Sequence, residues 1–193
     1  MEVDLIIGLG NPGREYEQTK HNVGWLLLDQ FKPLEDVYWK SKFKGEYTST
    51  ELKSHKLYFL KPQTYMNLSG ESARPLIDFF KLDPKRVLVL HDELDHPFGK
   101  VSFKKGGGLA GHNGLKSLAA HLETQDFYRM RIGIGRPQHG DVADYVLSKF
   151  SGDEAIALED YLHKAQSALS FFLKQGMSKA ANKYNKKNLV ELG

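Results

Sequence analysis

His21 and Asp92 are the two side chains of this sequence best suited to activating a water molecule. Imidazole takes up a proton near neutral pH, which makes His21 a candidate general base. Asp92 lies just past an apolar run typical of a buried strand, and its carboxylate could accept the other imidazole N–H. That contact would fix the histidine tautomer and stabilise the imidazolium formed during reaction. A single histidine is more often structural, so the sequence context alone leaves this pair a hypothesis.

Two other chemistries are less consistent with the residues. A metal site could be considered at the acid- and histidine-rich segment 91–96, but consecutive residues point in different directions and no H-E-x-x-H spacing is present. Cysteine is absent, and Ser69 and the other serines lack a G-x-S-x-G turn. We therefore expect direct attack by water, with no metal and no other cofactor.

The first glycine motif has two interpretations. Residues 8–13 match G-x-G-x-x-G after a strand, as in dinucleotide-binding proteins. That motif requires a helix that opens within the glycines, but residues 14–21 show no apolar stripe. The acid about 20 residues further on, Asp29, falls inside an expected helix. The glycines are better interpreted as a tight loop that exposes Asn11 at the carboxyl edge of the sheet.

Asn11, Asn67 and Asn113 are candidate binding residues, because an amide both donates and accepts hydrogen bonds without adding charge. The glycines between residues 106 and 114 directly precede the helix expected near Asn113. Backbone N–H groups at such a point could bind an anion or a carbonyl group.

The elements expected to position these residues alternate between strands and helices. The expected strands are 4–8, 47–52, 57–60, 86–90, 101–104 and 130–134. The expected helices are 23–31, one after Leu68, one from about 113 to 122, and a long helix behind Ser151. Ser151 and Glu154 match a capping box, and Ile156 begins the apolar face of that helix. The pattern predicts a single-domain α/β fold over residues 1–193, with a mixed, largely parallel sheet sandwiched between helices.

Composition and charge bound the class of protein. The chain has 193 residues, of which 40% are hydrophobic, enough for one sizeable core. It begins without a basic leader and has no apolar stretch near the ~20 residues of a membrane span, so we expect a cytoplasmic protein without membrane contact. The net charge is only +3, but residues 161–190 carry six lysines and no acid. Such a basic end, with residues 177–193 as a tail, suits a polyanion, although a solvated terminus would look the same.

Six segments, taken in order, resemble the motifs of the bacterial-type peptidyl-tRNA hydrolases. They are GLGNPG with Tyr16 (8–16), TKHNVG (19–24), KPQTYMNLSG (61–70), HDELD (91–95), GGGLAGHNG (106–114) and MRIGIGRP (130–137). One short motif arises easily by chance, whereas six in order do not. The clearest departure is Leu109-Ala110, where some members carry a more polar or glycine-rich pair, and it affects loop shape more than chemistry.

The resemblance implies hydrolysis of the ester that joins a peptide to its tRNA. It assigns His21 as the base and Asp92 as the acid that orients it. It implies that Asn67 and Asn113 hold the peptide backbone beside the ester. It also implies that Asn11 helps to distinguish peptidyl-tRNA from aminoacyl-tRNA with a free amine.

The same resemblance places Tyr16 and Tyr65 beside the substrate or the terminal adenosine, although core packing is the simpler interpretation of each tyrosine from sequence alone. It makes Lys104 and Arg131, on neighbouring strands, candidates for a phosphate clamp, whereas Lys104 could equally be a solvated charge. The partner is thus peptidyl-tRNA, and a monomer is expected. A noncatalytic RNA-binding module and, more distantly, a nucleotide-dependent oxidoreductase remain as alternatives.

Overall fold

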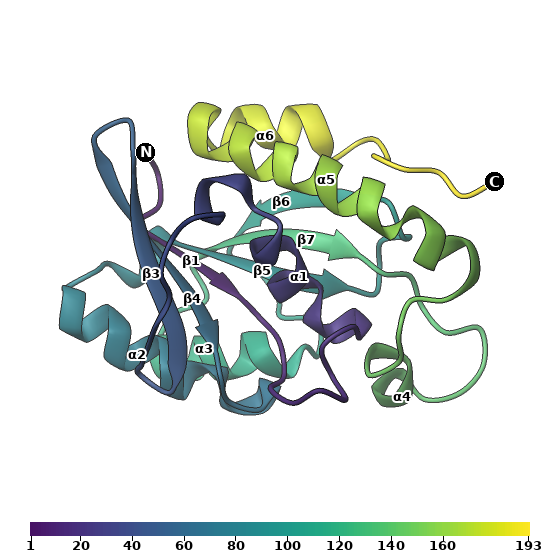
Figure 1. Ribbon diagram of the computed structural model, residues 1–193, viewed down its shortest axis with the longest axis horizontal. Coiled ribbons are helices and arrows are strands. Elements are labelled where there is room, and N and C mark those ends of the chain that lie inside the picture. The colour runs from purple at the N-terminus through teal and green to yellow at the C-terminus, as the bar shows by residue number, and fades with distance from the viewer.

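One seven-stranded sheet runs through the computed structural model, which describes residues 1–193, with the strand order β2-β3-β4-β1-β5-β7-β6 (Figure 1). The strands are β1 (Leu5–Gly8), β2 (Lys40–Lys42), β3 (Gly45–Leu52), β4 (His55–Pro62), β5 (Val87–Glu93), β6 (Val101–Lys105) and β7 (Tyr128–Gly133). The four central strands β4, β1, β5 and β7 are parallel, and the outer strands pair antiparallel. The predicted mixed sheet is confirmed, with its parallel pairings confined to the centre.

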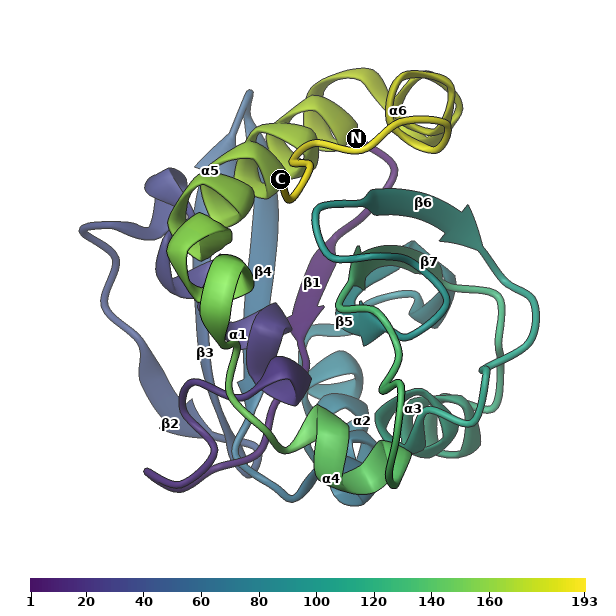
Figure 2. The ribbon, with the colours of Figure 1, turned by 90° about the vertical axis from the view of Figure 1, so that its right-hand side faces the viewer.

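Helices cover both faces of this sheet. They are α1 (Val23–Asp29), α2 (Ser69–Phe80), α3 (Asn113–Leu122), α4 (Val142–Val146), α5 (Gly152–Gln175) and α6 (Met177–Tyr184). Figures 1 and 2 show α5 and α6 on one side of the sheet, with α2 and α3 on the other. The expected sandwich of helix, sheet and helix is therefore confirmed. None of the helices combines the length and apolar character that crossing a bilayer requires.

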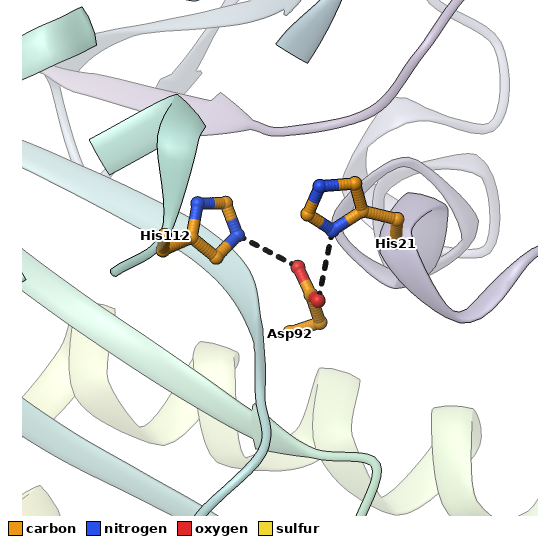
Figure 3. A group of neighbouring side chains, drawn as sticks. All are labelled: His21, Asp92 and His112. Atoms are coloured by element: carbon orange, nitrogen blue, oxygen red, sulfur yellow. Dashed lines mark hydrogen bonds and ion pairs between the residues drawn. The ribbon is translucent and has the colours of Figure 1, made fainter. Parts of the chain in front are cut away.

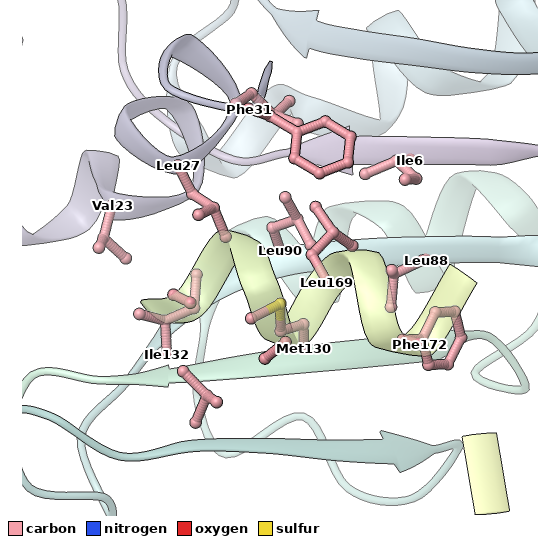
Figure 4. Packing of buried hydrophobic residues seen from close by; sticks show 14 of the residues in the cluster. Ile6, Val23, Leu27, Phe31, Leu88, Leu90, Met130, Ile132, Leu169 and Phe172 are labelled. Carbon is pink, nitrogen blue, oxygen red and sulfur yellow. The ribbon is translucent and has the colours of Figure 1, made fainter. Parts of the chain in front are cut away.

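Alternate side chains of the central strands enter two different hydrophobic clusters. Ile6 packs in the cluster that includes Leu27 of α1 and Leu169 of α5 (Figure 4), whereas Leu5 and Ile7 pack with residues of α2 and α3. Burial on both faces explains why these strands are continuous apolar runs in the sequence. The carboxyl ends of β1 and β5 therefore emerge from a sheet centre that is packed on both faces.

Helix α5 differs from the expectation at its start. Ser151 is the N-cap residue, but its side chain makes no capping hydrogen bond, so the predicted capping box is wrong in its contacts. Ile156 is 83% exposed and does not belong to the buried face. The buried residues of α5 begin at Tyr161, because the first turns of the helix lie before the part that covers the sheet.

The basic C-terminal segment packs against the edge strand β6. Ala180 and Tyr184 of α6 are buried, and the Asn185 side chain donates to and accepts from the backbone of Phe103. Further along, the N–H of Val190 donates to the carbonyl of Gly99. These contacts order a segment for which the sequence predicted only basic charge.

Candidate active site

The loops at the carboxyl ends of β1 and β5 border a pocket of about 590 Å³. Open α/β sheets place their ligands at this edge. Seven of the nine candidate site residues from the sequence line this pocket: Asn11, Tyr16, His21, Tyr65, Asn67, Asp92 and Asn113. They come from five separate stretches of the chain, which the fold brings together.

Asp92 is hydrogen-bonded to two histidines, His21 and His112, and all three residues line the pocket (Figure 3). His21 Nδ1 lies 2.9 Å from one carboxylate oxygen, and His112 Nε2 lies 2.8 Å from the other. His112 Nδ1 accepts the backbone N–H groups of Gly114 and Leu115, at 3.1 and 3.3 Å. Because that nitrogen accepts, it carries no proton, and His112 Nε2–H is the donor to Asp92. His112 is therefore held in one neutral tautomer by the start of α3.

The charges at this site support each other. Burial raises the pKa of the Asp92 carboxyl, but the electrostatic attraction and the hydrogen bonds of the two imidazoles outweigh burial, so the pKa falls below its usual value. Burial lowers the pKa of His21, whereas the charge of Asp92 and its hydrogen bond raise it, with a net increase. Asp92 is thus an anion that stabilises a proton on His21. With Nδ1–H donating to Asp92, His21 Nε2 remains as an acceptor.

A close approach of α1 to the sheet sets the position of His21. His21 belongs to a 3-10 turn (Lys20–Asn22) directly before α1. A Cβ atom added to Gly24 would lie 2.5 Å from the carbonyl oxygen of Leu90, the residue two before Asp92. Only glycine allows the helix to sit this near the strand, and so the histidine meets the carboxylate at hydrogen-bond distance.

Asn11 is fixed by its neighbours in a way that leaves one donor free. Its backbone N–H donates to Asn22 Oδ1, and Asn22 Nδ2 donates to the Asn11 carbonyl oxygen. The Asn11 side-chain oxygen accepts the N–H of Met66 at 2.7 Å. Its amide nitrogen therefore remains to face the pocket. No helix begins within residues 8–13, so the helix that dinucleotide binding requires is absent.

The other pocket residues lie at the ends of helices and turns. Asn113 is the first residue of α3, and Asn67 belongs to a 3-10 turn (Met66–Leu68) before α2. Tyr65 is 61% exposed and Tyr16 is half-buried. The core-packing interpretation is therefore wrong for Tyr65, whose ring faces the pocket and solvent.

One wall of the pocket is apolar. It is formed by α4 and the residue that follows it, and Leu94 and Leu109 from other loops add further apolar side chains to the lining. The α4 residues that line the pocket are Val142, Ala143 and Val146, followed by Leu147. Val142 and Leu147 are 38% and 41% exposed, high values for apolar side chains. A substrate with both polar groups and apolar side chains fits a pocket of this composition.

His112 is the site residue that sequence reasoning missed. Its motif contributed only Asn113 to the expected site. The available signal was its place directly before the expected helix start, which is the N-cap position. Its bond to Asp92 spans 20 residues of sequence and depends on how α3 meets β5.

His21, Asp92 and His112 also form a group whose ligand atoms lie within 4.8 Å of one another, close enough to be considered for a metal. Both Asp92 oxygens already accept hydrogen bonds of 2.8–2.9 Å from these two histidines. A metal would have to replace both bonds, so the donor set fits a proton-handling site better. The residues of segment 91–96 do not gather around a common point, since Glu93 pairs with Arg131 and Asp95 with Arg136.

Comparison with known proteins accounts for this geometry. Residues 5–191 match the family model of the peptidyl-tRNA hydrolases. The chain is 46% identical to the peptidyl-tRNA hydrolase of Geotalea daltonii over 98% of its length and 100% of that protein. It is 44% identical to that of Bdellovibrio bacteriovorus over 94% and 98%. The chain belongs to the peptidyl-tRNA hydrolase family.

The crystal structure of peptidyl-tRNA hydrolase from Acinetobacter baumannii has the same fold, with a TM-score of 0.88, 35% identity, and coverage of 98% of this chain and 97% of that one. Family membership makes this chain an enzyme of translation that releases the peptide from peptidyl-tRNA. The resemblance found in the sequence motifs is confirmed.

Lys104 and Arg131 lie outside the pocket of this hydrolase. They are on the adjacent antiparallel strands β6 and β7, as expected, but Lys104 is directly opposite Arg129. Arg131 is paired with Glu93 at 2.6 Å. Arg129, which the sequence did not single out, is 2% exposed and donates to the carbonyl of Gly106. A phosphate clamp formed by Lys104 and Arg131 remains a prediction.

Proposed function

We propose that His21 is the general base that activates water for attack on the ester of peptidyl-tRNA. The observation that carries this proposal is the 2.9 Å contact of His21 Nδ1 with the buried Asp92 carboxylate. Asp92 fixes the tautomer in which Nε2 accepts a proton from water and stabilises the resulting imidazolium. No residue of the pocket needs to form a covalent intermediate.

His112 acts through Asp92 in this scheme. By donating to the second carboxylate oxygen, it holds the carboxyl group in the plane that His21 requires. Its own Nδ1 accepts two backbone N–H groups, so it cannot readily exchange roles with His21. It is a positioning residue, since it need not touch the substrate.

The asparagines are proposed to position the acyl group. The free amide nitrogen of Asn11 donates to a carbonyl oxygen, and a donor there disfavours an ammonium group. This supports discrimination against aminoacyl-tRNA with a free amine. Asn67 and Asn113 contact the peptide backbone, so recognition depends little on the peptide sequence, and Tyr16 and Tyr65 contact the substrate with their rings.

Phosphates of the tRNA are proposed to contact Lys104, Arg131 and the lysines of residues 177–193. Exposed lysines on β6 and α6, which pack together, support this. One sheet that includes all strands supports the proposal that residues 1–193 form a single domain. We further propose that the enzyme acts as a monomer, without a cofactor, in the cytoplasm, where ribosomes produce its substrate.

Peptide release from N-acetyl-aminoacyl-tRNA tests the proposed function. Wild-type protein should release the acetylated amino acid in the presence of a chelator and spare the same tRNA with a free amine. His21→Ala should retain tRNA binding but lose roughly 10²–10⁴-fold in rate. Well-folded wild-type protein that binds tRNA without turnover would instead be an RNA-binding module.

A further inference from the structure

Lys20 stands directly before His21 in the chain, but its side chain is directed elsewhere. The residue is only 4% exposed and is not part of the pocket lining. Lysine is rarely buried to this extent unless its ammonium group is well hydrogen-bonded. Its partners therefore indicate its role.

The partners of Lys20 all lie at or just after α4. Nζ donates to Ser148 Oγ at 2.9 Å and to the carbonyl of Lys149 at 2.8 Å, and it lies 4.6 Å from the centre of the Tyr145 ring. The backbone N–H of Lys20 donates to the carbonyl of Ser148. The preceding residue, Thr19, forms a β-bridge with Lys149. Glu154 of α5 acts on the ammonium only through its charge, and both hydrogen bonds of Nζ go to the segment that follows α4.

Helix α4 depends on such anchors. It has only five residues, and a helix this short is not stable by itself. Its neighbour on the N-terminal side is an exposed loop with positive φ at Gly135 and Gly140. Apart from Lys20, the side-chain bond that ties α4 to the sheet is from the Tyr145 hydroxyl to the carbonyl of Ile134, at 2.6 Å.

We propose that Lys20 is a positioning residue that fixes α4, the apolar wall of the pocket, relative to the base. Lys20 and His21 share one 3-10 turn. The same turn therefore carries two contacts. His21 bonds Asp92, and Lys20 bonds the segment that ends α4. The wall then binds the apolar part of the acyl group at a fixed distance from His21. This inference rests on the site assignment of the proposed function.

Steady-state kinetics of Lys20→Met, measured with N-acetyl-phenylalanyl-tRNA, test the proposal. Loss of hydrogen bonds to a charged group should raise KM about tenfold. The value of kcat should stay within about threefold, because the contact between His21 and Asp92 is retained and the wall binds ground and transition states alike. Lys20→Arg, which keeps the charge and the donors, should restore KM to within about threefold of wild type.

Lys61→Met is the matched control. The Lys61 side chain is 13% exposed, bonds Asp29 at 2.8 Å and lies 4.5 Å from the Trp39 ring, but it contacts nothing on α4. This variant should leave KM unchanged. Ser148→Ala, at an exposed position, removes one acceptor of Lys20 and should raise KM about two- to fivefold even if Lys20→Met does not fold.

Two further readouts separate anchoring from other roles. Amide hydrogen exchange in residues 142–149 should become faster in Lys20→Met, with exchange in α2 unchanged. The slope of log KM against log salt should not change, whereas a lysine that contacts a tRNA phosphate would lower it by about one. The proposal is overturned by an unchanged KM in both variants, by a loss in kcat alone, or by a shallower salt slope. A wild type without turnover would count against the proposed function. The exchange measurement would still show whether Lys20 anchors α4.

Discussion

Asp92 binds two histidines with its two carboxylate oxygens, and the two imidazoles differ in what holds their other nitrogen. His112 gives its second nitrogen to the backbone at the start of α3, whereas His21 keeps Nε2 as a free acceptor at the pocket. Of the two imidazoles on this carboxylate, His112 is therefore fixed at both nitrogens, whereas His21 has a nitrogen that can take up a proton. This asymmetry supports the proposal that His21, and not His112, is the base.

The pH dependence of kcat/KM should report the raised pKa of His21. Below this pKa the imidazole is protonated and cannot accept a proton from water, so activity falls as the pH falls through a value above the ordinary histidine pKa of about 6.5. In Asp92→Asn, burial remains but the anion is lost, so the acid limb should move to lower pH. The maximal rate should also fall by roughly 10²–10⁴.

The control for this profile is Asp95→Asn, which removes an exposed carboxylate of the same motif that bonds Arg136 and not His21. Its acid limb should coincide with that of the wild type. An Asp92→Asn limb that stays in place, or moves to higher pH, would show that Asp92 does not set the protonation of the base.

His112 combines two tasks that substitutions can separate. Asparagine at this position can still cap α3 but is too short to reach Asp92. We expect His112→Asn to lower kcat about tenfold or more, because one carboxylate oxygen loses its partner, with little change in stability. His112→Ala should lower kcat similarly and also cost about 1 kcal/mol of unfolding free energy. Denaturant unfolding and steady-state kinetics on both variants measure the two effects. If kcat falls only in the variant that loses unfolding free energy, His112 does not orient Asp92.

At the residue scale, the sequence predicted which residues gather in the pocket better than how they are held. Residue type made His21 and Asp92 candidates for base and partner, the resemblance assigned them these roles, and both residues line the pocket. The contacts of Asn11 with Asn22 and Met66 span 11 and 55 residues of sequence. Such contacts follow from packing, and no local pattern contains them.

At the scale of elements, long periodic or apolar segments were predictable and short ones were not. The central strands and α3 have bounds close to the expected ones, because two-sided burial and helical spacing leave clear patterns. The three-residue strand β2 and the short helix α4 were not predicted, and no bounds were predicted for α6. Contacts with distant segments surround the two short helices, such as those of Lys20 with the end of α4 and of Glu2 with α6.

Helix α6 provides a test of this point. Glu2 Oε2 accepts the N–H of Met177 at 2.6 Å, so an N-terminal side chain caps the last helix. Glu2→Ala should weaken the docking of α6 by about 1 kcal/mol and accelerate amide exchange there. Glu35→Ala, at another exposed acid, should leave that exchange unchanged. Equal exchange in wild type and Glu2→Ala would show that the packing of α6 against β6 holds it without the cap.

At the scale of the whole molecule, the parallel centre of the sheet places β1 and β5 side by side with their carboxyl ends at one edge. The proposed catalytic residues lie at this edge, whereas the basic segment covers the edge strand β6. The fold class followed from alternation of strands and helices, but the proximity of the basic segment to β6 did not. Charge counts show how many lysines there are and cannot show which strand they lie beside.

The tRNA contacts proposed for this segment predict a salt effect. Replacing Lys179, Lys186 and Lys187 by glutamine should reduce the slope of log KM against log salt by up to about one for each phosphate that is no longer neutralised. A matched triple variant at the exposed lysines 53, 56 and 81 should retain the wild-type slope. Equal slopes in the two triple variants would show that the basic segment does not contact tRNA.

The most direct test of the account is the single-turnover rate of ester hydrolysis in wild type, His21→Ala, Asp92→Asn and the double variant, all with a chelator present. If Asp92 acts only through His21, the double variant should be no slower than His21→Ala, which itself loses roughly 10²–10⁴-fold. Multiplicative losses in the double variant, or a wild type inactivated by the chelator, would contradict a metal-free base oriented by one carboxylate.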